Sequence, residues 1–401
     1  GVLLGPAFLP GNQVRALLNG DAIFPPMLAA IRSARTSITF ETYIYWSGDI
    51  GRQFAEALAE RARQGVKVHV LLDWVGSVKM DDSLVATMAQ AGVQVQRFHP
   101  PHWSHLGRMN NRTHRKLLIV DGRVGFTGGV GVAPQWTGRA QNPEHWRDTH
   151  FAVEGPVVAQ MQSVFIDNWI KVTGDVLHGP DYFPALAPAG PAFAQMFSSS
   201  PSGGSESMQL MYLLSVTAAS RSIDLSASYF VPDELTLQAL VAAMQRGVRL
   251  RIIVPGQHID SETVRKASRA TWGPLLAAGA VIAEYTPTMY HCKVMIVDGM
   301  RKRNQHTGNA GGGQLSYGQG TSATHHEISP GQGSRHIINE WLHIGVGIRS
   351  LIGGLHRAQI VDQHHDLGAV AAEIEADYLR WPEFENAPRL ASHSPVGVIE
   401  L

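Results

Sequence analysis

Short stretches of alternating apolar and polar residues occur along the chain in two matching sets. Each set predicts a strand, then a helix, then a second strand. The elements are expected over 37–45, 51–64 and 65–72 in the first set and over 222–230, 234–246 and 247–254 in the second. The predicted helices end at Gly65 and Gly247, and the strands that follow are rich in β-branched residues. The chain therefore contains an internal duplication.

A further strand signal extends both sets, over 91–95 and 278–282. Alternation of strands and helices is typical of an α/β fold in which helices cover the faces of a sheet. We expect two similar lobes, each a β-sheet flanked by helices, with the active site at their interface. The first lobe is expected over 1–180, the second over 181–300, and a divergent, partly disordered segment over 301–401. The Pro- and Gly-rich stretch 179–204 is the expected linker.

Both copies carry the pattern H-x-K-x4-D at equivalent places. The residues are His114, Lys116 and Asp121 in the first copy and His291, Lys293 and Asp298 in the second. Residues two apart on a strand point to one face, so each histidine and its lysine are expected to face a common cavity. A single such motif is most often a coincidence, but two at matched positions of a repeat indicate catalysis. Two unrelated α/β lobes would share no such residues.

The duplicated motif resembles the paired motifs of the phospholipase D superfamily. The runs 40–48, 111–116 and 145–150 resemble its bacterial cardiolipin synthase branch, and the similarity covers about residues 10 to 300. The resemblance implies phosphodiester transfer through a phosphohistidine, with no metal or other cofactor. It further implies that His114 is the nucleophile and His291 the acid, although the symmetry of the motifs leaves the reverse order open. Lys116 and Lys293 would bind the non-bridging oxygens.

Three further residues are candidates for supporting the site. Asp148 is the expected partner of His114, because a carboxylate on the far ring nitrogen would fix the tautomer and support the imidazolium. Gly128 and Gly129 would let the backbone approach the substrate closely. Asp121 and Asp298, although members of the motif, are expected to face away from the phosphate and to organise the strand end and the adjoining turn.

Several aromatic residues and histidines have simpler interpretations. Tyr43, Tyr45 and Trp46 are expected to be core or rim aromatics, and His69 a packed or surface residue in mid-strand. Residues 99–111 form an insertion that the second copy lacks. It is either a substrate lid that contacts lipid or a plain surface loop. Contact with lipid is suggested by Trp103, Leu106 and Met109. A metal site could be suggested by His99, His102 and His105, but their setting in an inserted loop argues against it.

Charge and composition limit the partners. Lys plus Arg and Asp plus Glu each number 33, so an anionic substrate must be held by local charge, and no nucleic acid is expected.

The single cysteine, Cys292, excludes an internal disulfide framework. No apolar run is long enough to span a bilayer, so the chain reads as soluble or peripheral. It does not begin with Met, so an anchor could lie upstream. We expect the cytoplasmic side of the cell membrane.

The resemblance ends soon after the second motif. Residues 301–335 are rich in Gly, Gln, Ser and His and lack apolar periodicity, so we expect a mobile segment there. We hypothesise that the tail is an out-of-frame or replaced segment, in which case the second lobe would lack its closing strands and activity would be weak. Translation of the other reading frames of the encoding DNA tests this.

Three functions remain at this point. The first is phosphatidyl transfer on an anionic phospholipid such as phosphatidylglycerol, at a membrane surface. The second is hydrolysis, by a phospholipase D or a nuclease, although neutral net charge gives no support for the basic channel of a nuclease. The third is a non-catalytic protein that binds phosphate or lipid and has a damaged second lobe.

Overall fold

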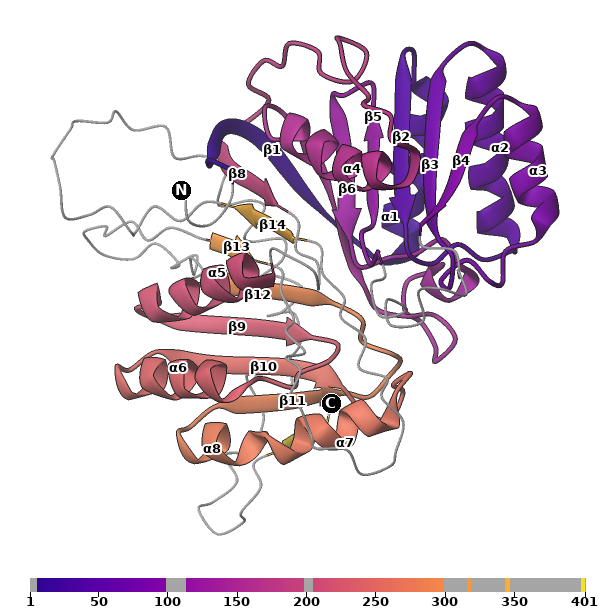
Figure 1. Ribbon diagram of the computed structural model, residues 1–401. Coiled ribbons are helices and arrows are strands. Elements are labelled where there is room, and N and C mark those ends of the chain that lie inside the picture. Colours follow the sequence, from indigo (N-terminus) through magenta and orange to yellow (C-terminus); the bar gives the residue numbers. More distant parts are fainter. Residues whose placement is uncertain are drawn as a thin grey trace, which may run out of the picture.

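The protein forms two similar halves, each a mixed β-sheet covered by helices (Figure 1). The computed structural model describes residues 6–98, 113–197, 205–298, 316–318, 343–346 and 398–400. The elements of the first half are β1 (Leu9–Leu18), α1 (Asn19–Ser33), β2 (Ser37–Thr42), α2 (Asp49–Arg63), β3 (Lys67–Asp73), α3 (Asp82–Gln90), β4 (Gln94–Phe98), β5 (Leu117–Val120), β6 (Val124–Gly128), β7 (Thr149–Glu154) and α4 (Val158–Thr173). A short 3-10 helix, Pro134–Trp136, precedes β7.

The second half repeats this order. Its elements are β8 (Ala192–Phe197), α5 (Ser205–Ala218), β9 (Ser222–Ala227), α6 (Glu234–Gln245), β10 (Arg249–Pro255), α7 (Glu262–Ala270), α8 (Trp272–Ala277), β11 (Val281–Tyr285), β12 (Lys293–Val297), β13 (Ser316–Gly318), β14 (His343–Val346) and β15 (Val398–Glu400). The predicted α/β fold with two duplicated lobes is therefore confirmed. Gly65 and Gly247 both follow a helix with φ near +90°, as a glycine that ends a helix should.

The strand order shows the duplication directly. It runs β15-β11-β10-β9-β12-β13-β14-β8-β1-β7-β6-β5-β2-β3-β4, so β1 and β8 lie together at the centre. Strands β2, β3 and β4 are parallel to one another, as are β9, β10 and β11. Strand β5, which follows His114, pairs antiparallel with β2, and β12, which follows His291, pairs antiparallel with β9. Each motif therefore occupies the equivalent position in its own half.

Two features differ from the sequence-based expectations. Strand β8 lies inside the predicted linker, because Ala192, Ala194 and Met196 are buried on alternate positions and pack into the core. The second half also has β13 and β14 next to β12, whereas the hypothesis of a replaced tail implied that the closing strands would be missing. The rest of the tail, including most of the segment expected to be mobile, lies outside the described residues.

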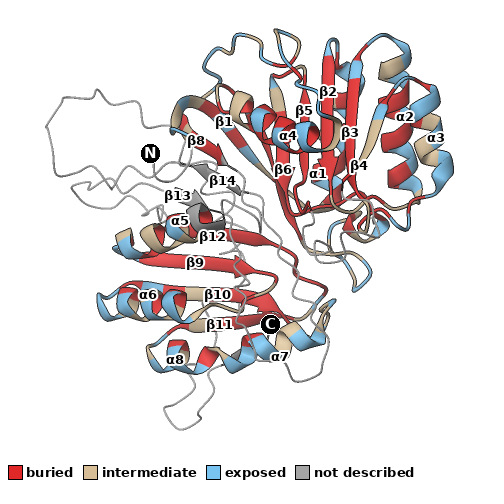
Figure 2. Ribbon diagram, in the orientation of Figure 1, coloured by how far each residue is buried: buried red, intermediate tan, exposed pale blue. Residues whose placement is uncertain are grey.

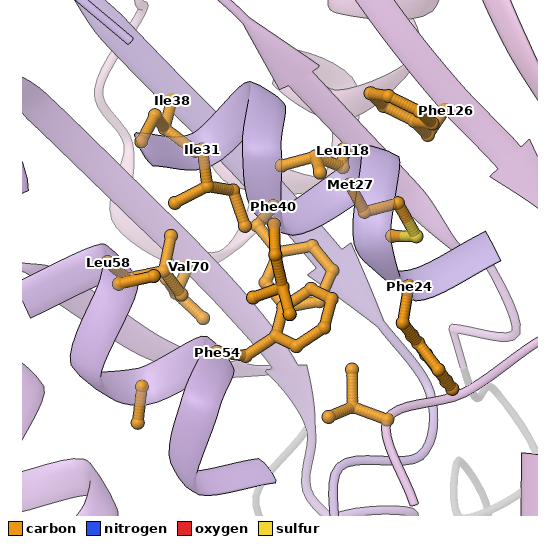
Figure 3. Close-up of a cluster of buried hydrophobic side chains, with 14 of the residues drawn as sticks. Phe24, Met27, Ile31, Ile38, Phe40, Phe54, Leu58, Val70, Leu118 and Phe126 are labelled. Carbon is orange, nitrogen blue, oxygen red and sulfur yellow. The ribbon is translucent and has the colours of Figure 1, made fainter. Parts of the chain in front are cut away.

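The core of the first half lies between the sheet and helices α1 and α2 (Figure 2). The spacing of Phe54 and Leu58 places both on one side of α2, and both are fully buried. The ring of Phe54 stacks on Phe40 of β2 with centroids 5.8 Å apart, as Figure 3 shows. This packing fixes β2, the strand that pairs with β5 of the first motif.

A second core on the opposite face joins the two halves. Helix α4 contributes Phe165 and Trp169, which stack on each other with ring centroids 5.7 Å apart. Val294 and Ile296 of β12 belong to the same cluster. Because β12 follows directly after His291, this shared core fixes the second motif against the first half.

Candidate active site

The two motif aspartates have matching structural roles. Asp121 and Asp298 follow β5 and β12 with φ of 52° and 55°, in the left-handed region. Each carboxylate accepts hydrogen bonds from three consecutive backbone N–H groups at the start of β2 or β9, namely Arg35, Thr36 and Ser37 for Asp121 and Ser220, Arg221 and Ser222 for Asp298. The expected role in organising the strand end is therefore confirmed.

His291 is held by a carboxylate from the other half. Its Nδ1 lies 2.7 Å from Oδ2 of Asp148, and both side chains are buried. The same oxygen accepts a hydrogen bond of 2.9 Å from Nε1 of Trp136. Asp148 was expected to support His114. The structure puts it on the histidine of the second motif, so the expected partner is corrected.

The charge of Asp148 is stabilised by this pairing. Burial on its own would raise the pKa of the carboxyl group, but the His291 ring, the Lys293 ammonium and the Thr149 N–H outweigh that effect and lower it. A buried carboxylate that stays ionised favours a positively charged imidazole beside it. The arrangement therefore suits His291 to carry a proton.

Lys293 lies against the same histidine. Its Nζ is 3.0 Å from Nε2 of His291 and 5.6 Å from the centre of the Tyr229 ring. The Tyr229 hydroxyl donates a hydrogen bond of 2.6 Å to Asp260. If Nδ1 of His291 donates to Asp148, Nε2 accepts from Lys293 in this arrangement. Lys293 therefore lies beside Nε2, the ring nitrogen of His291 that does not contact Asp148.

His114 is covered by an aromatic ring that the sequence analysis left out of the site. Tyr43 stacks on the imidazole with ring centroids 4.0 Å apart, and Nζ of Lys116 lies 5.7 Å from the centre of the Tyr43 ring. Tyr45 and Trp46 are core and rim residues as expected, because Tyr45 is fully buried and Trp46 is partly buried. Tyr43 follows β2 and Tyr229 follows β9, and ligand sites of α/β sheets form at such strand ends. That signal could have identified them.

A buried polar network holds the residue before His114. Thr113 donates its hydroxyl hydrogen bond to Glu41 and its N–H to Asp73, the latter at 3.1 Å. Asn168 of α4 donates to the same Glu41 oxygen at 2.7 Å. Burial raises the pKa of Glu41. Sequence patterns gave no indication of this network, because its members are far apart along the chain.

The segment that carries His291 is hydrogen-bonded to the start of β7. The N–H of Arg147 donates to Met289 at 2.9 Å, and the N–H of His291 donates to the carbonyl of Arg147 at 2.8 Å. The Thr288 hydroxyl also donates to the carbonyl of His145 at 2.8 Å. The second motif is therefore fixed to the first half through backbone contacts and not through Asp148 alone.

Both motif histidines lie at one edge of the first sheet. His114 precedes β5 and Asp148 precedes β7, and these two strands both pair antiparallel with β6. Their first residues therefore meet at the same edge. Because His291 is hydrogen-bonded to Asp148, it lies at the same edge of the first sheet as His114.

The two glycines leave room for side chains. A Cβ atom on Gly129 would lie 2.1 Å from Oδ1 of Asp148, and one on Gly128 would lie 2.7 Å from Nδ1 of His150. The expectation was that these glycines bring backbone close to the substrate. Their nearest described neighbours are the carboxylate that holds His291 and the residues Thr149 and His150 of β7, so the approach to substrate stays a prediction.

The insertion 99–111, with its lipid-contact and metal candidates, lies outside the residues that the structure describes. His69 is packed as expected, since its Nε2 lies 2.7 Å from the hydroxyl of Tyr182 and its ring contacts Trp169 edge-on.

Comparison with known proteins identifies the family. The family described as "Cardiolipin synthase, PLD-like domain" matches residues 27–169 and 213–311, which include both motifs. The chain belongs to this cardiolipin synthase PLD-like family. The predicted resemblance is therefore confirmed.

Relatives in the family are about 35% identical to the chain over the matched region. The cardiolipin synthase of Geobacillus kaustophilus is 36% identical over 291 residues, which cover 72% of the chain and 58% of that protein. Cardiolipin synthase A of Pseudomonas fluorescens is 35% identical over 72% of the chain and 60% of its own length. The match thus spans less than two thirds of these curated relatives.

Among solved structures, phosphatidylserine synthase from Haemophilus influenzae matches with a TM-score of 0.48 and 9% identity, over 74% of the chain and 80% of that protein.

Within the ranges that the structure describes, each helix is too short or too polar to cross a bilayer.

Proposed function

We propose that this chain transfers a phosphatidyl group from one anionic phospholipid to an alcohol, as a cardiolipin synthase. The observation that carries the proposal is the buried hydrogen bond between Nδ1 of His291 and Asp148, which joins the second motif to the first half. A histidine that is held by a buried carboxylate suits proton delivery to a phosphate ester, and the lysine 3.0 Å from its other nitrogen is placed to bind the phosphate. Membership of the cardiolipin synthase PLD-like family supports the substrate class.

In the first half-reaction, His114 acts as the nucleophile. Its neutral imidazole attacks the phosphorus of phosphatidylglycerol, and a P–N bond forms as the bond between phosphorus and the glycerol headgroup oxygen breaks. Protonated His291 gives its Nε2 proton to that oxygen, so glycerol leaves as the neutral alcohol. The phosphatidyl group remains on His114.

In the second half-reaction, His291 acts as the base. Its ring is now neutral and takes the hydroxyl proton of a second phosphatidylglycerol, whose oxygen attacks the phosphorus while the P–N bond breaks. Cardiolipin and a neutral His114 are the products, and His291 is protonated again. Asp148 favours the protonated ring in each cycle, which supports the assignment of His291 as the acid.

The two lysines offset the phosphate charge. Lys116 and Lys293 would bind the non-bridging oxygens, where negative charge concentrates in the transition state. A phosphate oxygen that accepts from Lys293 also takes this lysine away from Nε2 of His291, and so leaves that nitrogen available to carry a proton. Substrate binding would thereby switch His291 to its acid form.

The setting of the reaction is also a proposal. We place the chain at a membrane surface, on the cytoplasmic side, as a peripheral protein or one held by a segment outside this chain. The lobes are proposed to run over 1–180 and 181–300, with a divergent segment over 301–401.

Product analysis tests the proposal. Purified protein is incubated with phosphatidylglycerol vesicles, and the lipids are separated by thin-layer chromatography and identified by mass spectrometry. We expect cardiolipin and free glycerol, together with an acid-labile adduct on the protein that His114→Ala abolishes. His178→Ala, which removes an exposed histidine, is the matched control and should behave as the unchanged protein.

The other outcomes each identify a different function. Phosphatidic acid without cardiolipin would indicate a hydrolase. Cleavage of an oligonucleotide under the same conditions would indicate a nuclease. If neither product nor adduct forms, the chain is a non-catalytic phosphate- or lipid-binding member of the family, and the proposal is wrong.

A further inference from the structure

His150 is a buried histidine for which the proposed reaction has no use. It lies on β7, two residues after Asp148, and only 1% of its surface is exposed. Among the residues that the structure describes, neither ring nitrogen has a hydrogen-bond partner. Buried polar groups in native proteins nearly always have a partner, and this ring has both a donor and an acceptor to satisfy. The position therefore needs a partner other than the protein groups that the structure describes.

The strand register places His150 beside Lys116. Leu117 of β5 pairs with Thr127 of β6, so the next pair in that direction is Lys116 with Gly128. Gly128 in turn pairs with His150 of β7. Residues directly opposite each other in antiparallel strands share a face, so Lys116 and His150 stand on one face with only a glycine between them.

Gly128 has no side chain between Lys116 and His150, and a Cβ atom there would lie 2.5 Å from the Cα atom of His150. The Nδ1 atom of His150 lies 2.7 Å from where a Cβ atom of Gly128 would be, so the imidazole leans over the glycine. Two strand spacings separate Lys116 from His150, about 10 Å between their backbones. A lysine side chain, one water molecule and an imidazole can together cover that distance.

A small cavity is lined by both residues. It has about 10 Å³ of room for the centre of a water molecule, which is close to the least volume that holds one water. Apart from Lys116, His150 and Thr42, its walls are mainly apolar, with Phe24, Met27 and Phe40 among them. The polar side chains therefore determine how a water in the cavity would be oriented.

Charge also connects His150 with both neighbours. Burial lowers the pKa of His150 to about 3, the negative charge of Asp148 acts against this shift, and the positive charge of Lys116 adds to it. The ring is therefore neutral throughout the physiological range and lies near both charges. A neutral imidazole can accept a hydrogen bond without adding repulsion toward the ammonium of Lys116.

We propose that His150 is a positioning residue for Lys116, which acts through a water molecule that occupies the cavity they share. The water donates to a ring nitrogen of His150 and accepts from the ammonium of Lys116. The ammonium is thereby directed toward the phosphate at the edge of the sheet. The effect on kcat rests on the proposed function. The water itself does not, because it should be present in the protein without substrate.

The kinetic test replaces His150 in two ways. His150→Leu removes both hydrogen-bonding groups and keeps an apolar side chain, whereas His150→Gln keeps a donor and an acceptor. A hydrogen bond to a charged group corresponds to about 10- to 100-fold in rate, so we expect His150→Leu to lower kcat of cardiolipin formation by that factor with KM within about 3-fold. His150→Gln should restore kcat to within about 5-fold of the unchanged protein.

His69→Leu is the matched control. His69 is also buried, but it lies on β3 against Trp169 of α4 and outside the cavity. It should lower the melting temperature without changing kcat of the folded fraction. If folded His150→Leu has the kcat of the unchanged protein, or if His150→Gln is as slow as His150→Leu, the positioning role is wrong.

A crystallographic test is independent of activity and of whether the variants fold. A high-resolution crystal structure of the unchanged chain should contain a water within hydrogen-bond distance of both Lys116 Nζ and a ring nitrogen of His150. A cavity without that water, or a water that contacts only one of the two, would overturn the inference. If the water is present but the chain forms no cardiolipin, the proposed function fails while the hydrogen-bonded link remains.

Discussion

Asp148→Asn tests the hydrogen bond that joins the two halves of the site. The substitution keeps the size of the side chain and removes its charge. In the structure, one oxygen of Asp148 accepts from both Nδ1 of His291 and Nε1 of Trp136, at 2.7 and 2.9 Å. An amide can place either its oxygen or its NH2 group there. The oxygen keeps both contacts in weaker form, whereas the NH2 group loses the Trp136 contact and can only donate to Nδ1 of a neutral His291 ring.

The magnitude follows from burial. A hydrogen bond to a charged group contributes about 1.5–3 kcal/mol, and leaving a buried charge without its partner costs about 3–5 kcal/mol. Asparagine retains some of the interaction, so we expect a loss of about 2–4 kcal/mol in stabilisation of protonated His291. At about 1.4 kcal/mol per factor of ten, kcat of transfer should fall about 30- to 1,000-fold.

The change should also be visible in the dependence of stability on pH. The pKa of Asp148 in the folded protein is below its ordinary value of 3.8. A lowered pKa stabilises the fold above the ordinary value, and this contribution is lost as the pH falls through the folded-state pKa. The difference in unfolding free energy between the unchanged protein and Asp148→Asn should therefore shrink in acid.

The assay is the initial rate of cardiolipin formation across a pH series, with urea unfolding of the same preparations. Asp181→Asn, which removes an exposed carboxylate bonded to Lys67, is the matched control and should leave kcat unchanged. If Asp148→Asn is folded and as active as the unchanged protein, His291 does not need its carboxylate, and the assignment of His291 as the acid is refuted.

Three further predictions concern other positions. Asp298→Asn should lower the free energy of unfolding by about 1–3 kcal/mol in urea titrations, because the carboxylate accepts from three backbone N–H groups. Burial would raise the pKa of Asp298 but its hydrogen bonds lower it, so this difference should close in acid. Glu41→Gln should become more stable relative to the unchanged protein as the pH rises, measured by melting temperature, because burial raises the pKa of Glu41 and disfavours its charged form. Lys293→Met should lower kcat by at least about 100-fold, and Lys293→Arg should retain more activity than Lys293→Met, since only the arginine keeps a positive charge at the phosphate.

Each of these has a clear contrary result. Equal urea midpoints for Asp298→Asn and the unchanged protein would show that the turn holds without the carboxylate. A loss of stability in Glu41→Gln that grows with pH would mean that Glu41 is ionised in the folded state. Full activity in Lys293→Met would remove this lysine from phosphate binding.

Much of the fold could be predicted from the sequence, because repeated local patterns carry it. The strands around 37–45 and 222–230 alternate apolar and polar residues, and the helices after them end at Gly65 and Gly247. Strand β8 escaped prediction because its alternation lies among prolines and glycines that indicate a linker. Tertiary pairing with β1 decides that segment, and no local pattern reports such pairing.

The site was predictable where its residues belong to the repeat. The two histidines, their lysines and the aspartates that end the strands all follow from the matched motifs. Glu41 and Asn168 meet Thr113 from β2 and α4, and no spacing along the chain connects them. Tyr43 was treated as a rim aromatic, because an aromatic residue at a strand end looks the same in sequence whether or not it stacks on a histidine.

The partner of Asp148 illustrates a general property of duplicated sites. Sequence proximity favours His114, because both residues belong to the first half. The central strands β1 and β8 and the core shared by α4 and β12 bring the halves together, so that a carboxylate at the start of β7 meets the ring that precedes β12. In the proposed mechanism, the first half then provides the nucleophile that forms the phosphohistidine and also the carboxylate that supports the acid of the other half. Separated halves would each lack an essential part, so activity should require the shared core as much as the motifs.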